Sequence, residues 1–166
     1  MDTGPDHVEG HGVGTRPFRE DDVPFLWDML LLSIHVREGD PPADRSVLAA
    51  PEIAHYLDGF GRPGDDAQVA VDGSGHPVGA AWCRVMGADD PGYGFVAPDV
   101  PELGTAVVPS HRGRGIGVRL ITELLERHPV MSLSVDLDNV RAERLYARLG
   151  FVRVGVVGTA ATMVRR

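Results

Sequence analysis

The stretch VVPSHRGRGIGVRL, residues 107–120, constrains the fold more than any other part of the sequence. An apolar, β-prone run ends at Pro109, and apolar residues recur at helical spacing from Ile116 onward. A glycine-rich turn that opens a helix brings together unpaired backbone N–H groups and the positive end of the helix dipole. The stretch therefore predicts a strand, a turn suited to a phosphate or pyrophosphate, and a helix that begins near Gly115.

The turn carries two residue types that suit an anion. Its glycines let a ligand approach the backbone with no Cβ in the way, and its arginines can add charge-assisted hydrogen bonds. These residues are Arg112, Gly113, Arg114, Gly115 and Gly117. Taken alone, they are also compatible with an ordinary glycine-rich connection that carries solvated arginines.

The spacing of the glycines disfavours a dinucleotide-binding loop. The pattern GxGxxG would need a third glycine at position 118 or 120, where the sequence has Val118 and Leu120. The chain also contains no lysine, because all sixteen of its Lys and Arg positions are arginine. A Walker phosphate loop and a pyridoxal Schiff base both require a lysine, so neither site can form.

The size and charge of the chain limit the remaining classes of protein. With 166 residues it can bury one sizeable core. The formal charge of -8 argues against a general nucleic-acid binder, which needs a basic stripe. No apolar run approaches the roughly 18 to 20 residues of a membrane span, and the acidic N-terminus lacks the positive region of a signal peptide. We therefore expect a cytoplasmic protein with no membrane or nucleic-acid partner.

Strand and helix patterns alternate along the chain and predict a single mixed α/β domain over residues 13–166. The expected order is β-α-α-β-β-β-α-β-α-β. Strands are expected over residues 13–18, 67–71, 77–85, 102–108, 130–135 and 151–157, with a further strand suggested near residues 161–166. Helices are expected over residues 24–34, within residues 43–57, and over residues 115–127 and 139–149.

Residues 1–12 show no hydrophobic periodicity, which predicts a flexible N-terminal arm. His7 and His11 in this arm could in principle share a metal ion. No further ligand lies nearby in the sequence, so we expect two solvated histidines and no metal site.

Two motifs in the second half of the chain resemble the GNAT superfamily of N-acetyltransferases. Residues 112–117, Arg-Gly-Arg-Gly-Ile-Gly, resemble the family signature R/Q-x-x-G-x-G/A, which also lies between a strand and a helix. About thirty residues later, a second segment resembles the family pattern N-x-x-A-x-x-L-Y-x-x-x-G-F. Its matching residues are Asn139, Ala142, Leu145, Tyr146, Gly150 and Phe151. The resemblance covers roughly residues 13–160 and implies a GNAT-like domain with a central, mostly antiparallel sheet flanked by helices.

The resemblance implies an N-acetyltransferase that joins acetyl-CoA and a primary amine in a ternary complex for direct transfer. The turn would hold the CoA pyrophosphate, the preceding strand the pantetheine arm, and Asn139 the pantetheine or adenosine side. Tyr146 would protonate the departing thiolate, since a phenol with a pKa of about 10 is protonated at neutral pH. The implied cofactor-binding residues are Ala106, Val107, Val108, Arg112, Gly113, Arg114, Gly115, Ile116, Gly117, Val118 and Asn139.

The identity of the amine follows less directly. The overall acidity of the chain favours a small cationic amine, because negative potential would concentrate an ammonium substrate. The long stretch at residues 87–101, with Tyr93 and Phe95, is expected to wall off a small pocket. Acetylation of a protein N-terminus or lysine would instead need an open groove. The resemblance is also compatible with a homodimer.

A general base must remove a proton from the ammonium group before it can attack. Many members of the family have a glutamate five residues before the motif asparagine, where this chain has Ser134. Glu102, at the head of the strand that leads to the turn, is the substitute we expect. Its spacing to Arg112 is one residue shorter than is common, so a solvated carboxylate on the wrong face is an equal alternative. Asp99 and Asp136 are weaker candidates.

Two further alternatives remain open from the sequence. Loss of the usual glutamate at position 134 would also suit a regulatory protein that binds CoA with little catalysis. Cys83, the only cysteine, could be an acyl-carrying nucleophile, but it lies in the apolar run AAWCRV with no adjacent histidine. We therefore expect a buried, inert thiol.

Overall fold

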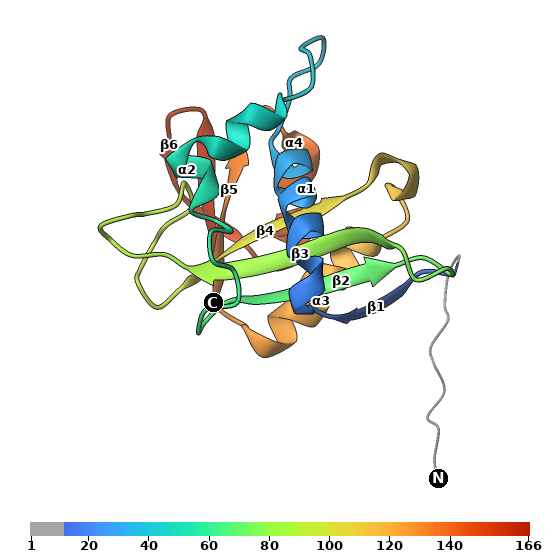
Figure 1. Cartoon of the computed structure of the whole chain (residues 1–166). Helices are drawn as coiled ribbons and strands as arrows, with labels where there is room; N and C mark the ends of the chain where they lie inside the picture. Colours follow the sequence, from blue (N-terminus) through green and yellow to red (C-terminus); the bar gives the residue numbers. More distant parts are fainter. Residues whose placement is uncertain (1–11) are drawn as a thin grey trace.

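The computed structural model describes residues 12–166 (Figure 1). The predicted N-terminal arm, apart from its last residue, lies outside the described residues, as do His7 and His11. None of the helices in the described part of the chain has both the length and the apolar character to cross a bilayer.

A mixed sheet forms the centre of the fold, as predicted. Its strands are β1 (Gly14–Pro17), β2 (Asp66–Val71), β3 (Pro77–Val85), β4 (Pro101–Val107), β5 (Met131–Asp136), β6 (Val152–Val157) and β7 (Ala160–Arg165). Their order across the sheet is β1-β2-β3-β4-β5-β7-β6. Within residues 12–166, only the pairing of β4 with β5 is parallel.

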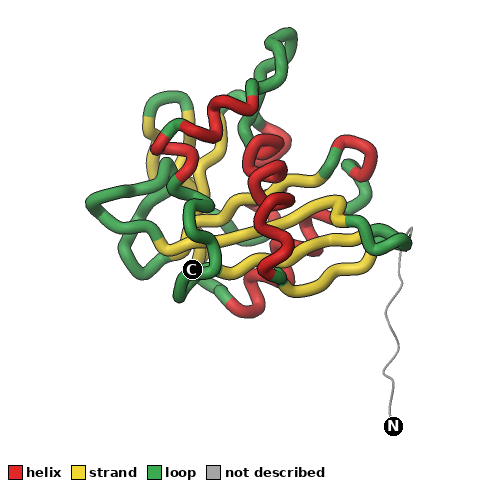
Figure 2. The backbone as a smooth tube through the Cα atoms, viewed as in Figure 1, coloured by secondary structure: helices red, strands yellow, loops and turns green. Residues whose placement is uncertain are grey.

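Helices cover both faces of the sheet (Figure 2). The longer ones are α1 (Val23–Ser33), α3 (Ile116–Arg127) and α4 (Val140–Arg148). Helix α1 packs on β3 and β4, and α3 packs on β2 and β3 across the opposite face (Figure 1). The apolar stripe predicted for α3 is confirmed, because its members are all buried: Ile116, Leu120, Ile121, Leu124 and Leu125.

The helix predicted within residues 43–57 is present, but it is short. The chain there forms a 3-10 turn, η2 (Arg45–Ala49), and one turn of helix, α2 (Pro51–Ala54). Ala50 separates them in an extended conformation, with a ψ angle of 128°. Pro51 explains the break, since the residue before a proline is excluded from the helical region.

The further strand suggested near residues 161–166 is confirmed by β7, which follows β6 in the sequence but lies between β5 and β6 in the sheet. The chain therefore turns back after β6 and inserts its last strand beside β5. Every residue of β6 is left exposed at the edge of the sheet.

Strands β4 and β5 separate soon after they meet. Their register contains a single pair, Glu102 with Ser132. The two strands then run in different directions, with β5 turned steeply away from β4 (Figure 1). The backbone of the later part of β4 is consequently not covered by β5.

A buried ion pair fixes the segment after α2 to the sheet. The Arg84 guanidinium donates to Asp65 Oδ1 at 2.9 Å and to Oδ2 at 2.8 Å. It also donates to the carbonyl oxygens of His55 and Asp58, at 2.9 and 2.7 Å. The side chains of Arg84 and Asp65 are only 2% and 3% exposed. Burial makes this pair costly to break, because either charge alone would remain unsolvated.

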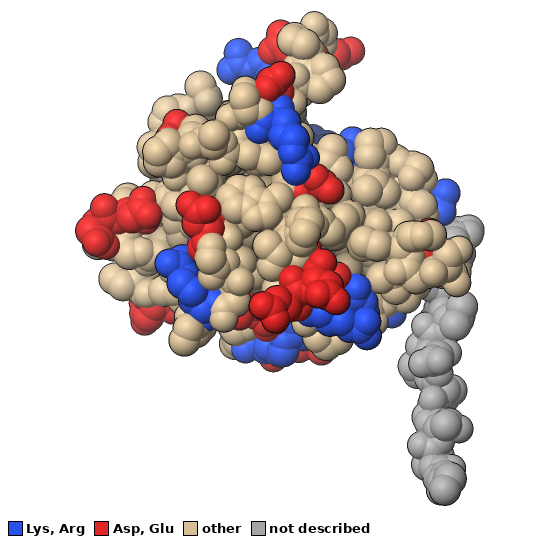
Figure 3. Space-filling view, in the orientation of Figure 1, with Lys and Arg blue, Asp and Glu red and all other residues tan. Residues whose placement is uncertain are grey.

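In contrast to the buried pair of Arg84 and Asp65, charged side chains on the surface form exposed pairs. Basic and acidic side chains lie next to one another on the face shown in Figure 3. The Arg45–Asp28 pair is of this exposed kind, with a separation of 2.7 Å and side chains 62% and 52% exposed. Such pairs contribute little to stability, because water already solvates both partners.

We predict that Arg84→Met lowers the free energy of unfolding by about 3–5 kcal/mol, since it leaves Asp65 buried without its partner. Urea denaturation at neutral pH measures the loss. Arg45→Met is the matched control and should cost less than about 1 kcal/mol. Equal losses in the two variants would contradict the structural role of the buried pair.

Candidate active site

Two cavities adjoin each other where β4 and β5 separate. The first, here called the tyrosine cavity, has a volume of about 510 Å³ and is lined by Tyr56, Tyr93 and Tyr146 among others. The second, the turn cavity, has a volume of about 580 Å³ and is lined by Arg112 and Tyr146 among others. The two share five lining residues: Ser33, Ile34, His35, Thr105 and Tyr146. Tyr146 therefore stands at the boundary between them.

The turn before α3 presents free backbone amides. Within the described chain, no acceptor is found for the N–H groups of residues 113–118. Gly113 and Gly115 have φ angles of +75° and +76°, and Gly115 is the N-cap of α3. A Cβ at either glycine would meet no atom within 4 Å, so the backbone angle and not lack of space favours glycine. The strand, turn and helix predicted from the sequence are all present.

The Arg112 side chain links the turn to β4. Its Nε donates to the carbonyl oxygen of Val107 at 2.9 Å, and its guanidinium lines the turn cavity. A positive charge thus lies directly before the free amides in the chain. Arg114 and Val118 are exposed beside them.

Only some residues of β4 direct their backbone N–H and C=O groups toward the gap between β4 and β5. The N–H of Val108 already donates to the Val78 carbonyl on β3, at 2.9 Å. Alternation along an antiparallel strand directs Ala106 to β3 as well, and directs Thr105 and Val107 toward the gap. Of the three residues expected to meet the pantetheine arm, Val107 is the one with its backbone turned to the cavities.

Glu102 is buried at the floor of the tyrosine cavity, with 4% of its surface exposed. Its Oε1 accepts hydrogen bonds from the Tyr56 hydroxyl at 2.7 Å and from the Gly94 N–H at 2.8 Å. The alternative of a solvated strand-end carboxylate is therefore wrong. Burial raises the pKa of Glu102 even though these two hydrogen bonds oppose the shift.

The segment at residues 87–101 buries this carboxylate by close contact. A Cβ at Gly92 would lie 2.0 Å from Glu102 Oε2, and a Cβ at Gly94 would lie 2.5 Å from the backbone carbon of Leu133. Only glycine allows such an approach at either position. The segment predicted as a long surface loop is thus fitted between Glu102 and β5.

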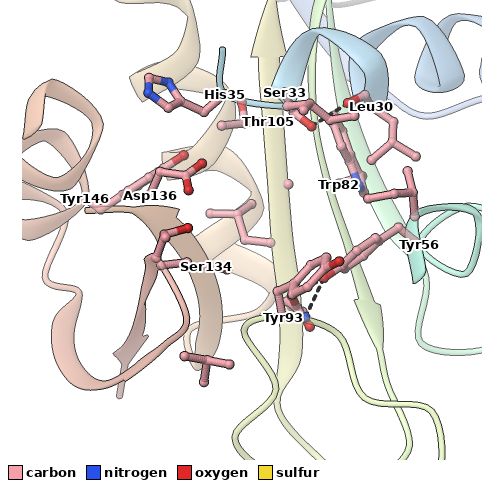
Figure 4. A pocket seen from close by; sticks show the side chains of 18 of the residues that line it. Leu30, Ser33, His35, Tyr56, Trp82, Tyr93, Thr105, Ser134, Asp136 and Tyr146 are labelled. Atoms are coloured by element: carbon pink, nitrogen blue, oxygen red, sulfur yellow. Dashed lines mark hydrogen bonds between the residues drawn. The ribbon is translucent and has the colours of Figure 1, made fainter. Parts of the chain in front are cut away.

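Tyr56 was not identified from the sequence, although it contacts the candidate base directly. Its hydroxyl donates to Glu102 and accepts a hydrogen bond from the Tyr93 N–H at 2.7 Å (Figure 4). Burial, followed by the charge of Glu102, raises the pKa of Tyr56. No spacing rule connects residues 46 positions apart, so only the folded chain brings this pair together.

Helix α4 positions Tyr146, and both of its predicted ends are confirmed. The Asn139 side chain caps the helix by accepting from the Ala142 N–H at 3.3 Å, and Gly150 has a φ angle of +93° just after its end. Asn139 also lines the turn cavity. The Tyr146 ring packs edge-on against Phe151, with centroids 6.0 Å apart.

The Tyr146 hydroxyl is a neutral proton donor at physiological pH. Burial raises the pKa of Tyr146 to about 12. In Figure 4, Tyr146 and Asp136 lie on one side of the tyrosine cavity, while Tyr56 and Tyr93 lie on the other. A molecule in this cavity would therefore contact Tyr146 on the side that adjoins the turn cavity.

The other residues considered in the sequence fall into two groups. Ser134 and Asp136 both line the tyrosine cavity, whereas Asp99 lines neither cavity. Cys83 is buried in β3, and burial raises the pKa of its thiol to about 12. The predicted burial of this thiol is confirmed, and a raised pKa leaves little of the reactive thiolate at neutral pH.

Comparison with known proteins points to one family. The sequence profile of the acetyltransferase (GNAT) family matches residues 31–151. The chain is 33% identical over 126 residues to the mycothiol acetyltransferase of Thermobispora bispora, an alignment that covers 74% of this chain and 42% of that protein. It is 50% identical over 52 residues to the N-alpha-acetyltransferase RimI of Mycobacterium tuberculosis, covering 30% of this chain and 33% of that protein. The chain thus matches less than half the length of these curated relatives.

The fold has counterparts among solved structures. A GCN5-related N-acetyltransferase from Kribbella flavida superposes with a TM-score of 0.64 at 19% sequence identity. The superposition covers 93% of this chain and 97% of that chain. The two chains therefore share one fold over most of their length.

We predict that Glu102→Gln removes a pH dependence from the stability of the protein. Because burial raises the pKa of Glu102, the folded state keeps its proton where the unfolded chain has lost it. The contribution of Glu102 to the free energy of unfolding is fully present below the unfolded pKa of about 4.3. It is lost as the pH rises through the folded pKa. Glutamine retains an acceptor for Tyr56 and Gly94 but does not titrate.

Urea denaturation of both proteins at a series of pH values tests this. The wild-type free energy of unfolding should fall relative to that of Glu102→Gln as the pH rises from the unfolded pKa of Glu102 to its folded pKa. Two parallel curves would show that the carboxylate is not desolvated in the folded state.

Proposed function

The chain belongs to the acetyltransferase (GNAT) family, and we propose that it transfers an acetyl group from acetyl-CoA to a primary amine of a small cationic molecule. The observation that supports this most is the position of Tyr146 between two adjoining cavities of opposite character. One is lined by Arg112, which precedes the free amides of the turn in the sequence, and the other is lined by the buried carboxylate of Glu102. A thioester and an amine placed in the two cavities would meet beside Tyr146.

The anionic charge of acetyl-CoA suits the turn and the cavity beside it. The N–H groups of residues 113–118 would bind the pyrophosphate, where the helix dipole adds positive potential. Arg112 and Arg114 would add charge-assisted hydrogen bonds to phosphate oxygens. The gap-facing backbone of Val107 would receive the pantetheine amides, and Asn139 would contact the same arm.

The amine fits the tyrosine cavity by its charge. Among the described residues that line it, acidic groups are supplied by Glu102 and Asp136, and none is an arginine. The aromatic rings of Tyr56, Tyr93 and Trp82 can contact the alkyl part of an amine or the face of its ammonium group. The hydrogen bond from Tyr93 to Tyr56 holds the segment at residues 87–101 against this cavity, which favours a small acceptor over a long peptide.

In the proposed reaction, one residue accepts a proton from the amine and another donates a proton to the departing thiolate. Glu102 accepts a proton from the ammonium group, and its raised pKa makes it a better base than an ordinary carboxylate. The neutral amine attacks the thioester carbon, so that a C–N bond forms and the C–S bond breaks. Tyr146 gives its proton to the departing sulfur and regains one from the nitrogen. The presence of Glu102 in the cavity favours catalysis over a purely CoA-binding role.

We predict acetyl-CoA-dependent acetylation of small diamines and loss of turnover in Tyr146→Phe. Thiol release is measured with small diamines, amino acids and peptides with a free N-terminus. General acid catalysis contributes about 100-fold or more, so kcat should fall by about that factor while the thermal shift caused by acetyl-CoA is retained.

The outcomes of this assay separate the alternatives. No amine above background hydrolysis would rule out the enzyme, and preference for the peptide would favour a protein substrate. Unchanged turnover in Tyr146→Phe would remove that residue as the acid.

We also predict that Gly115→Ala weakens CoA binding about tenfold, as measured by calorimetry. Its φ angle of +76° is unfavourable by about 1–2 kcal/mol for a residue with a Cβ, so the turn should relax and misdirect its amides. Gly155→Ala is the matched control, because a Cβ at Gly155 also meets no atom within 4 Å and its φ angle is ordinary. Equal affinities in the two variants would argue against the turn as the phosphate site.

A further inference from the structure

Three buried side-chain atoms in the described chain have no hydrogen-bond partner: His55 Nε2, Glu102 Oε2 and Ser132 Oγ. They belong to one region of the fold. Ser132 and Glu102 are register partners in β4 and β5, so their side chains lie on the same face of the sheet. His55 immediately follows α2, and its ring packs edge-on against that of Tyr56, with centroids 4.6 Å apart, while the Tyr56 hydroxyl donates to Glu102. Buried polar atoms are rarely left unpaired, which suggests a shared partner.

The His55 ring connects this region to the surface. Its Nδ1 lies 2.9 Å from Asp90 Oδ1, and the side chains of His55 and Asp90 are 11% and 69% exposed. A carboxylate beside Nδ1 favours the tautomer that carries the proton there, which leaves Nε2 as an acceptor on the buried side. The ring therefore has an accepting atom facing inward and a donating atom facing outward.

A separate cavity lies on the outer side of this histidine. It has a volume of about 480 Å³ and is lined by His55, Arg62, Asp65 and Asp90 among others. It shares no lining residue with the tyrosine cavity. His55 thus lies between the buried carboxylate of the candidate active site and a cavity on another part of the surface.

We propose that His55 is the exit for the proton that acetyl transfer releases, and that it receives this proton from Glu102 through one internal water molecule. Glu102 Oε2, Ser132 Oγ and His55 Nε2 would hold the water, and buried waters typically make about three such bonds. Asp90 then passes the proton to solvent. The inference rests on the proposed function, because it assigns Glu102 as the base.

The proton balance of the reaction explains why an exit is needed. In each turnover the ammonium nitrogen loses two protons as the C–N bond forms. One ends on the sulfur through Tyr146, and the other is left on Glu102. Glu102 is 4% exposed and its Oε1 is already contacted by Tyr56 and Gly94. While the acetylated product fills the cavity that Glu102 lines, a route through Oε2 lets the carboxylate lose its proton.

The route predicts a specific pattern in His55→Ala. The kcat for acetyl transfer should fall roughly 10- to 100-fold, while the KM values for acetyl-CoA and for the amine stay unchanged, because His55 lines neither of their cavities. Added imidazole should restore kcat, since the space left by the ring adjoins the outer cavity. His76→Ala, whose side chain is 78% exposed, is the control and should show neither loss nor rescue.

A merely structural role for His55 would produce a different result. Loss of activity that imidazole does not relieve, or a change confined to KM, would overturn the relay, as would full activity in His55→Ala. Asp90→Asn provides a second, surface variant and should lower kcat without affecting the fold. A wild-type protein that acetylates no amine would overturn the proposed function together with the relay, whereas an active wild type with an unaffected variant would overturn the relay alone.

Discussion

The pairing of β4 with β5 at one position alone is the constraint on which the rest of the site depends. Because the strands pair only at Glu102 and Ser132, the later backbone of β4 is not satisfied by β5. The separation is supported from two sides. Helix α3 packs its apolar face across β2, β3 and β4, and Gly94 fits so closely against the backbone of Leu133 that a Cβ would clash at 2.5 Å. A sheet that closed here would leave no space for either cavity.

The gap between β4 and β5 also keeps a positively charged region apart from a negatively charged one. At the turn, unpaired amides and Arg112 create positive potential at one end of the gap. Around the tyrosine cavity, Glu102 and Asp136 supply negative potential. An acidic chain can therefore hold an anionic donor locally without losing its attraction for a cationic acceptor. Tyr146 lies at the boundary and, with its pKa raised to about 12, brings no charge of its own.

Short-range sequence patterns predicted most helices and strands, whereas long-range contacts determine which side chains meet in the candidate site. The turn at residues 112–117, the apolar stripe of α3 and the capping of α4 by Asn139 all follow from short spacings in the sequence. The break at Ala50 could have been predicted from Pro51, whereas the place of β7 could not, because strand order depends on tertiary packing. Tyr56 reaches Glu102 only through folding across more than forty residues, and no local pattern indicates such a pairing.

The position of the carboxylate explains why position 134 is neutral in this chain. Ser134 and Glu102 line the same cavity from β5 and β4. A glutamate at position 134 would add a second carboxylate there, and two nearby like charges disfavour ionisation of both. With a neutral Ser134, the buried carboxylate of Glu102 is perturbed mainly by loss of solvent. Burial of a carboxylate at the head of β4 requires cover from a closely fitted segment, and the glycines at positions 92 and 94 make that cover sterically possible.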